Sequence, residues 1–556
     1  MHHCLTIPEV LGLIFEKVKK HGGEYPPWSD DEALETFASL ALTCRAFQDP
    51  ALDMLWSEQD TIRNVLKTLP SCLWVERKES GPSGWDVGFY FRIINTIEPE
   101  DWAVPLSYAR RIRKLSLRYE HEEEFPDAAM FKAIASAPAE HFCPNLRSLV
   151  WASQEEAHLP FLNIFLGPNL ESARIILDHF ESSLPDNLSF RNLKNLEFHC
   201  KMPSSATCRA ASDLLTRLER VENLVVPCLD RNAVKYLSHL PSLRSLELSS
   251  AAILPNGDTA ATSSSEATPA HSPPFPALRN VKFDDRPLPG SIVECLQMLP
   301  VGCPIECFVT FVNEDAAEES FASLFTEVGT RFSSASLRTL EIKSRAQWVF
   351  NIDRLENPGA LIPLLSFHNL TKLLLILPIA IGIDDAMAWD CATSWPSLVR
   401  LEMREPGAGL SRSPPCMTMN ALRAFATHCR RLKHLSLNVD GSTIPSLDDD
   451  DSSESVASPR CTLSFLDVGS SPIHDAETVA KFLADLFPHL RNIYCQDWRW
   501  GGYTARQDED GVRARLHYTR WKAVEVALES EDEEDEDEDD EDGSGGSLTG
   551  EEDGED

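Results

Sequence analysis

The sequence lacks the long apolar runs and the catalytic motifs that would assign it to a membrane protein or to a common enzyme class. The longest apolar run, residues 373–383, has 11 residues and an internal proline, whereas a helix needs about 20 to cross a bilayer. No basic N-terminal segment precedes a long apolar one, so no secretory signal is expected. The sequence also has no phosphate-binding glycine loop, no GxSxG elbow and no HExxH helix. We therefore expect a protein that is not an enzyme and has no membrane segment.

Metal ligands at suitable spacing are also lacking. His2, His3 and Cys4 lie together, and Cys303 and Cys307 are spaced CxxxC. Neither group has a second pair of ligands at the spacing of a zinc site. We therefore expect no bound metal and no cofactor.

Basic residues are scarce, with 51 Lys and Arg against 87 Asp and Glu and a net charge of −36. Residues 529–556 alone contain 18 acidic residues and no basic one. No basic stripe with interleaved aromatic residues occurs, so nucleic-acid binding is not expected. Fifteen scattered cysteines, an odd number, fit a reducing compartment better than a disulfide framework, which indicates the cytoplasm or the nucleus.

Residues 5–56 have the pattern of three short helices. Thr6 and Glu9 can form a capping box, and a second box at Ser29 starts the next helix. Asp49 and Pro50 are expected to break that helix and to start a third. About 50 residues bury too little surface to be stable alone, so the module caps the core of the chain, binds another protein, or does both. The apolar face of the first helix consists of Ile7, Val10, Leu11, Ile14, Phe15 and Val18.

The segments IPEVLGLIF and LALTCRAF in this module resemble the F-box, with its apolar-Pro-Glu start and its Cys-basic-x-aromatic end. In that family the helices bind the SKP-type linker subunit of a cullin-based ubiquitin ligase. The resemblance implies the following linker contacts: Ile7, Pro8, Glu9, Val10, Leu11, Ile14, Phe15, Leu40, Cys44 and Phe47.

From residue 109 onward the chain repeats an LxxLxL phrase, with fourteen copies spaced by 22 to 35 residues. Positions four and six of the phrase point to one side of a short strand and form a core, while their neighbours point to the other side. Helical stretches lie between the copies, so the pattern predicts an α/β stack of parallel strands inside and helices outside. The copies begin at residues 112, 146, 170, 193, 221, 243, 278, 305, 337, 370, 398, 432, 463 and 490.

This pattern resembles the leucine-rich-repeat horseshoe. Residues 97–117, IEPEDWAVPLSYARRIRKLSL, are similar to the junction that precedes such repeats in fungal-type F-box proteins. The expected organisation is an F-box (1–60), a junction and N-terminal cap (61–108), repeats (109–512) with disordered inserts at 255–274 and 440–459, a C-terminal cap helix (513–530) and a disordered acidic tail (531–556).

Two sets of side chains on the repeats are candidates for recognition. The second position of eight phrases is basic and would form a row along one rim, which nearby acids would neutralise: Arg113, Arg147, Lys194, Arg244, Arg279, Arg338, Lys433 and Arg491. The alternation also points other strand residues outward, where a target would be bound. These substrate-binding candidates are Glu341, Lys343, Leu374, Ile376, Arg400, Glu402, Arg404, His434 and Asn438. The alternative for Leu374 and Ile376 is that a loop or a helix covers them.

The leading hypothesis is a substrate-recognition subunit of an SCF-type ubiquitin ligase. The F-box would bind the linker, and through it a cullin, and the repeats would hold a protein target that the sequence does not identify. One alternative is a leucine-rich-repeat scaffold, or an acidic-tail chaperone for basic proteins, that acts independently of a ligase. Another is a family member whose F-box has decayed.

Overall fold

The computed structural model describes most of the chain, which forms two compact units. One unit contains residues 1–287 and 294–304, and the other contains residues 288–293 and 305–556. The described residues are 7–21, 30–80, 87–118, 126–153, 155–179, 185, 188, 190, 192–202, 204–249, 274–284, 287–313, 318–344, 354–355, 358–404, 415–445, 461–496 and 509–537.

Three helices open the first unit: α1 (Pro8–His21), α2 (Asp30–Thr43) and α3 (Arg45–Trp56). The predicted break at Asp49 and Pro50 is wrong, because α2 and α3 are separated at Cys44, whose backbone is extended (φ −159°, ψ 161°). Pro50 lies inside α3. Lacking an N–H, Pro50 cannot donate the backbone hydrogen bond that residue 46 would accept, so α3 loses one bond there. The capping residues Thr6 and Ser29 lie outside the described residues.

Each of the fourteen LxxLxL phrases forms a strand that begins at or near its third residue, so the predicted α/β fold of parallel strands and helices is confirmed. In the first unit a short additional strand precedes them, and adjacent strands pair in parallel. The strand order is β1 (Glu58–Gln59), β4 (Lys114–Arg118), β5 (Ser148–Ser153), β6 (Ser172–Leu177), β7 (Asn195–Cys200), β8 (Asn223–Val226), β9 (Ser245–Leu248) and β10 (Asn280–Phe283).

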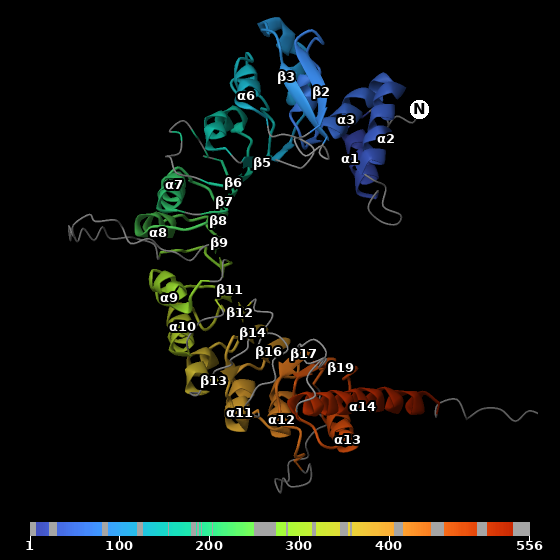
Figure 1. Cartoon of the computed structure of the whole chain (residues 1–556), viewed down its shortest axis with the longest axis vertical. Helices are drawn as coiled ribbons and strands as arrows, with labels where there is room; N and C mark the ends of the chain where they lie inside the picture. Colours follow the sequence, from blue (N-terminus) through green and yellow to red (C-terminus); the bar gives the residue numbers. More distant parts are fainter. Residues whose placement is uncertain are drawn as a thin grey trace, which may run out of the picture. The chain divides into compact units, whose positions relative to one another are not determined.

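Helices of the first unit cover one face of its sheet, and Figure 1 shows α6, α7 and α8 on the same side of the strands. Asp127 and Asp230 begin α6 and α8 by accepting a hydrogen bond from the backbone N–H three residues later, at 2.7 Å in both cases. The other elements are α4 (Arg63–Leu66), the antiparallel pair β2 (Trp74–Ser80) and β3 (Val87–Ile93), η2 (Pro99–Trp102), α5 (Ala103–Ala109), α6 (Ala128–Ala135), η3 (Glu156–Phe165), α7 (Ser205–Leu215) and α8 (Arg231–Ser238).

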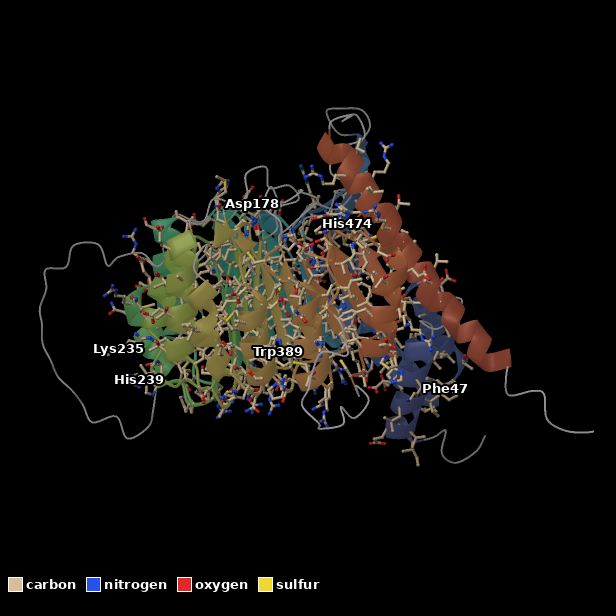
Figure 2. The ribbon with its side chains drawn as sticks, turned by 90° about the horizontal axis from the view of Figure 1, so that it is seen from below. Phe47, Asp178, Lys235, His239, Trp389 and His474 are labelled. Atoms are coloured by element: carbon tan, nitrogen blue, oxygen red, sulfur yellow. A yellow bond between two sulfur atoms is a disulfide. The ribbon has the colours of Figure 1, made fainter. Side chains whose placement is uncertain are left out.

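The second unit repeats the same arrangement, and α11, α12 and α13 lie on one side of its strands (Figure 1). Trp389 lies on α11 at this helical surface (Figure 2). The strands, in the order of the sheet, are β11 (Cys307–Val312), β12 (Thr339–Ser344), β14 (Lys372–Ile376), β16 (Arg400–Arg404), β17 (His434–Leu437), β18 (Phe465–Gly469) and β19 (Asn492–Cys495). The remaining elements are α9 (Pro289–Gln297), α10 (Glu318–Arg331), β13 (Arg354–Leu355), η4 (Pro358–Ser366), β15 (Ala380–Ile381), α11 (Asp385–Ser394), α12 (Met419–His428), α13 (Ala476–Leu486) and α14 (Glu509–Asp537).

Positions four and six of the phrase are buried throughout, as in Leu115 and Leu117 at 1% exposure and Leu340 and Ile342 at 0%. The same positions meet across adjacent strands, for example Leu340 with Leu373 and Leu373 with Leu401. Because the phrase repeats once per strand, these pairs stack into a continuous apolar ladder between the sheet and the helices.

Helix α14 lies against α13 and β19 at the end of the second unit. Trp521 and Val524 are buried there, and the indole N–H of Trp521 donates to the carbonyl of Ser471 at 2.9 Å. The helix extends beyond 513–530 at both ends, so residues 531–537 are helical and not part of a disordered tail. The predicted tail residues 538–556 lie outside the described residues.

Two further expectations are corrected. The insert predicted at 440–459 begins later, because the N–H groups of Asp440 and Gly441 donate to the carbonyls of Met417 and Pro472 at 2.8 and 2.9 Å. Cys208 and Cys228 form a disulfide with Cα atoms 5.3 Å apart, which the count of cysteines did not indicate. The insert predicted at 255–274 falls, apart from its last residue, outside the described residues.

Among the described residues, no helix has both the length and the apolar content that crossing a membrane requires. The described residues also contain no group of three or more His, Cys, Asp or Glu side chains that is arranged to hold a metal ion.

Candidate functional site

The three N-terminal helices share a small core made by Leu11, Phe15, Phe37 and Ala51. The ring of Phe15 packs against the rings of Phe37 and Phe47, with centroids 5.9 Å apart in both pairs. Figure 2 marks Phe47 on these helices. Leu11 and Phe15 are only 1% and 4% exposed, so they hold α1 against α2 and α3.

A second stripe of α1 remains open to solvent. Ile7, Ile14 and Val18 are 37%, 39% and 37% exposed, and Val10 between them is half-buried. These residues are spaced three, four and seven apart, so they lie on one side of the helix, next to the buried pair. The apolar face of α1 is therefore wider than the internal core of the module requires.

Helix α3 attaches the module to the rest of the first unit. The guanidinium of Arg111 forms ion pairs with Asp49, at 2.7 Å, and with Asp53. The rings of Trp56 and Tyr108 stack with centroids 4.5 Å apart. The module thus meets the first repeats through α3 and through Lys19 of α1, which pairs with Glu58 of β1 at 3.0 Å. These contacts leave the stripe on α1 exposed.

The structure divides the predicted linker contacts into three groups: exposed, half-buried and buried. Pro8 and Glu9 are exposed together with Ile7 and Ile14. Leu40, Cys44 and Phe47 are half-buried, and Leu40 and Phe47 pack on the small core. Leu11 and Phe15, being buried, position the others and offer almost no surface.

Other exposed apolar residues of the module were not among the predicted contacts. Leu13, Leu34 and Leu42 are 65%, 42% and 89% exposed. A groove on α2 is lined by Glu35, Thr36, Ser39, Leu40 and Thr43. Leu13 departs from the apolar face of α1, so its exposure could be predicted. The exposure of Leu42 could not, because it depends on how α2 packs.

The second candidate surface is the face of the strands in the second unit that does not meet the helices. Strand register places Glu341, Leu374 and Glu402 side by side, followed by Ser436 and Asp467. The next level of the face brings Lys343, Ile376 and Arg404 together. All of them except Ser436 and Asp467 were predicted to face outward, and strand register places them on one face.

Glu402 lies at the centre of an ion-pair network on this face. Its carboxylate pairs with Arg400, with His434 at 3.3 Å and with Arg404 at 3.7 Å. Burial opposes ionisation of Glu402, but hydrogen bonds from His434 and Arg400 and the positive charges of Arg400 and Arg404 outweigh it and lower the pKa to about 2. Glu402 is therefore an anion at neutral pH.

Glu341 forms a second ion-pair group with Lys343 at 2.5 Å and with Lys372 at 2.6 Å. Burial raises the pKa of Glu341, but the hydrogen bonds from the two lysines reverse the effect, so the net pKa is lowered. Lys343 also lies over the ring of Phe311, 4.8 Å from its centroid.

Three of the predicted target contacts are covered. Glu341, Leu374 and Glu402 are only 7%, 5% and 4% exposed. The cations around the two carboxylates take up their surface, and Leu374 lies between them. The candidates that present more surface are Arg400, which is exposed, and Lys343, Ile376, Arg404, His434 and Asn438, which are half-buried.

Sequence reasoning missed Lys372 and Asp467 in this network. Asp467 accepts a hydrogen bond from Ser436 at 3.0 Å and lies 3.9 Å from Arg404. Burial raises the pKa of Asp467, and the opposing hydrogen bonds from Gly469 and Ser436 do not cancel it. Both residues belong to LxxLxL phrases at outward positions, so the alternation that selected Glu341 and Glu402 could also have found them.

Replacing Glu402 with glutamine is expected to lower the free energy of unfolding by about 1–3 kcal/mol at pH 7, because Arg400 and Arg404 lose a buried counter-charge. The folded pKa of Glu402 lies below its usual value of 4.5. Its stabilisation is therefore complete above pH 4.5 and is lost as the pH falls toward about 2. Urea unfolding measures the free energy of unfolding of both proteins. The difference between wild type and variant should become smaller as the pH falls across this range. Glu222→Gln, at an exposed ion pair of 3.9 Å with Arg244, should change the free energy by less than about 0.5 kcal/mol at any pH.

Comparisons with known proteins were made for the whole chain. No protein-family model and no curated protein matches the sequence. Among solved structures, a leucine-rich-repeat protein of Leptospira interrogans is similar at 12% identity and a TM-score of 0.34, over 70% of this chain and 80% of that chain. A structure of the yeast Rad7–Elc1 complex is similar at 13% identity and a TM-score of 0.28, over 87% of each chain.

Proposed function

We propose that the chain is a substrate receptor of an SCF-type, cullin-based ubiquitin ligase. The helices α1, α2 and α3 act as an F-box that binds the SKP-type linker subunit, and the strand face of the repeats binds a protein target. The observation that carries the proposal is the exposed stripe of Ile7, Ile14 and Val18 on a helix whose sequence, IPEVLGLIF, resembles the F-box.

The stripe is physically suited to a partner helix. Complete removal of a large aliphatic side chain from water contributes roughly 1.5–3 kcal/mol. The side chains of the stripe are between one third and two fifths exposed, so a partner that covers them gains part of this energy at each residue. Leu11 and Phe15 fix the rotation of α1 about its axis, so the stripe is presented without rearrangement. A preformed apolar face loses little conformational entropy on binding.

The receptor performs no bond chemistry in this proposal. It holds the linker at one end and a target on the repeats, and so raises the effective concentration of the target near the ubiquitin-charged enzyme. The network around Glu402 supports the second task, because it fixes the side chains of Arg400, Arg404 and His434 on the strand face. The two fixed arginines can bind acidic or polar groups of a target with little loss of side-chain entropy.

Replacing Ile14 with aspartate in the full chain is expected to weaken binding of a purified SKP-type linker by at least about 100-fold. The change removes apolar contact area and puts an unpaired carboxylate into the interface. The matched control is Leu516→Asp, because Leu516 is a similarly exposed aliphatic residue, at 45%, on α14. Isothermal titration calorimetry gives both affinities.

Two outcomes contradict the proposal. If the wild-type chain does not bind the linker, α1–α3 does not function as an F-box. If Ile14→Asp binds as tightly as Leu516→Asp, the linker binds elsewhere. Circular dichroism of each variant separates loss of binding from loss of folding.

A further inference from the structure

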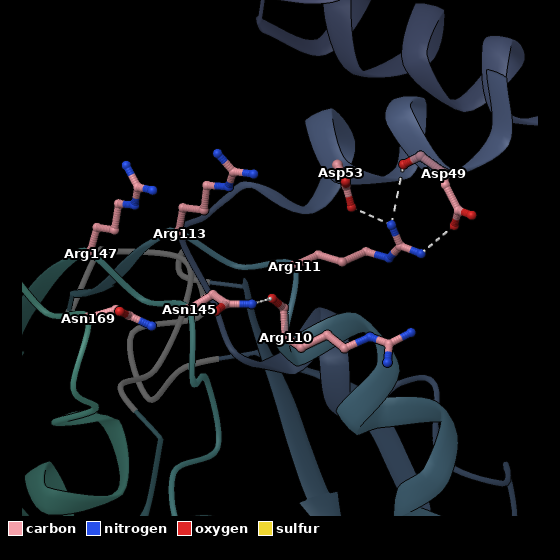
Figure 3. Close-up of a pocket in the computed structure, with 8 residues that line it drawn as sticks. All are labelled: Asp49, Asp53, Arg110, Arg111, Arg113, Asn145, Arg147 and Asn169. Atoms are coloured by element: carbon pink, nitrogen blue, oxygen red, sulfur yellow. Dashed lines mark hydrogen bonds and ion pairs between the residues drawn. The ribbon is translucent and has the colours of Figure 1, made fainter. Parts of the chain in front are cut away.

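A cleft of about 640 Å³ lies where α3 meets the first repeats, and arginine dominates its lining (Figure 3). It is distinct from the stripe on α1 and from the strand face of the second unit, and neither task assigned above uses it. The lining residues are Asp49, Asp53, Arg110, Arg111, Arg113, Asn145, Arg147 and Asn169.

Only one of the four guanidinium groups is neutralised within the cleft. Arg111 pairs with both Asp49 and Asp53. Arg110, Arg113 and Arg147 form no ion pair with any described residue. Figure 3 shows Arg113 and Arg147 extending side by side in the same direction. The cleft therefore has a local excess of two positive charges, in a chain whose net charge is −36.

The next basic residues of the rim are paired with acids instead. Farther along the same row Lys194 lies 3.5 Å from Glu171, and Arg244 lies 3.9 Å from Glu222. Glu171 and Glu222 occupy the second position of the intervening phrases, so acids and bases alternate there. Between Arg113 and Arg147 no phrase intervenes, because the backbone N–H of Arg147 donates directly to the carbonyl of Arg113 at 2.8 Å.

The two asparagines add acceptor groups to the cleft. The side-chain amide of Asn145 donates to the carbonyl of Arg110 at 2.8 Å, and that of Asn169 donates to the carbonyl of Pro144 at 3.0 Å. These bonds fix both amide groups and use their nitrogen atoms, which leaves the Oδ1 oxygens without a hydrogen bond in the described residues. The cleft thus combines guanidinium donors for anions with fixed carbonyl acceptors for N–H groups.

We infer that this cleft binds an acidic peptide segment. Guanidinium groups pair with carboxylates in a two-point geometry, and the asparagine oxygens can accept the backbone N–H groups that a peptide has and a small inorganic anion lacks. Alternate side chains of an extended peptide lie about 7 Å apart. Arg113 and Arg147 immediately precede the adjacent strands β4 and β5, where the backbones are about 5 Å apart. Their long side chains can span the remaining distance to side chains about 7 Å apart on a peptide.

The expected occupant is an acidic segment of a partner protein, because its charge complements the excess of guanidinium groups in the cleft. The chain's own residues 529–556, which contain 18 acidic residues and no basic one, are the alternative that the test separates. The chemistry of binding is the same for both. The inference does not depend on the proposed ligase role, since Arg113 and Arg147 are not among the linker contacts.

The test uses a fluorescently labelled synthetic peptide with the sequence of residues 529–556 and measures its anisotropy with the full chain and with a chain ending at Asp537. The second chain keeps Trp521 and Val524, the packing residues of α14. Saturable binding is expected in at least one chain, and it should weaken as NaCl rises from 50 to 500 mM. Equal affinities of the two chains are expected for a cleft that binds a partner segment. Tighter binding by the shorter chain would show that the tail occupies the cleft in the full chain, and it would overturn the assignment to a partner.

The double variant Arg113→Gln, Arg147→Gln, made in the chain that binds more tightly, is expected to raise the dissociation constant at least 10-fold. The matched control is Lys194→Gln, Arg244→Gln, which removes the same charge from rim residues that form ion pairs with acids. It should change the dissociation constant less than 3-fold. Equal losses in both variants would show general charge attraction only and would overturn the inference, as would a lack of binding by both chains. The Arg113→Gln, Arg147→Gln variant should still bind the linker. A loss of peptide binding by the cleft is therefore distinguishable from a loss of linker binding, which would contradict the proposed function.

Discussion

Replacing Trp521 with alanine is expected to lower the free energy of unfolding of the second unit by about 3–5 kcal/mol. Trp521 is 1% exposed and covers the end of the core with Val524, which is 0% exposed. Its indole N–H also holds the carbonyl of Ser471. The substitution removes a large apolar side chain at the end of the stack, where no further repeat can close the gap.

Hydrogen exchange followed by mass spectrometry measures this effect locally. Peptides that contain β18 and β19 should exchange faster in Trp521→Ala, and the effect should decrease toward β11. Val526→Ala is the matched control, because Val526 lies on the same helix and is 63% exposed; its exchange should equal that of the wild type. Unchanged protection of β18 and β19 in Trp521→Ala would show that α14 does not stabilise the last repeat.

The strands could be predicted because the information is local. In the LxxLxL phrase two apolar residues alternate with polar ones, and this pattern alone determines which side of a strand is buried. Thr310 occupies position six of its phrase and is 0% exposed despite its hydroxyl. The position of a residue along the strand therefore determines its burial more strongly than the hydropathy of its side chain. Repetition of the phrase then predicts parallel pairing of neighbouring strands.

The break between α2 and α3 could not be located from the sequence. Proline is a helix breaker in the interior of a helix, but it is tolerated near the start. Whether Pro50 ends one helix or lies in the first turns of the next depends on where the preceding residues turn. The turn occurs at Cys44, a residue with no strong turn preference, so tertiary packing decides the position.

The ion pairs between strands, such as Glu402 with His434 and Glu341 with Lys372, could not be predicted because they join residues about 30 positions apart. The alternation identified Glu402 and Arg400 as outward-facing, but it does not give the distance from Glu402 to His434 or from Glu341 to Lys372. Those distances depend on strand register, and register turned a row of expected contacts into buried carboxylates surrounded by cations.

The basic row on the rim shows the same limit. The sequence predicted that nearby acids would neutralise the row, and Lys194 and Arg244 do form ion pairs with acids. The prediction fails for Arg113 and Arg147. The nearby acids Asp49 and Asp53 are both paired with Arg111, which is not part of the row. Competition between neighbouring cations for one pair of carboxylates is visible only in three dimensions.

Replacing Phe131 with alanine is expected to lower the free energy of unfolding of the first unit by about 3–5 kcal/mol. Phe131 lies on α6, is 0% exposed and stacks on Trp151 and Phe161 with ring centroids 5.1 and 5.4 Å apart. These rings join α6, β5 and η3, so removing the central one leaves a cavity that three separate elements cannot close together.

Lys132→Ala is the matched control, because Lys132 is the next residue of α6 and is exposed. Hydrogen exchange should accelerate at β5 and β6 in Phe131→Ala and remain unchanged in the control. Exchange at β18 and β19 should also be unchanged, since each strand of the stack contacts only its neighbours and a local cavity destabilises nearby repeats most. Equal acceleration in both units of the chain would contradict this, because it would mean that the repeats unfold as one cooperative block rather than through nearest-neighbour contacts.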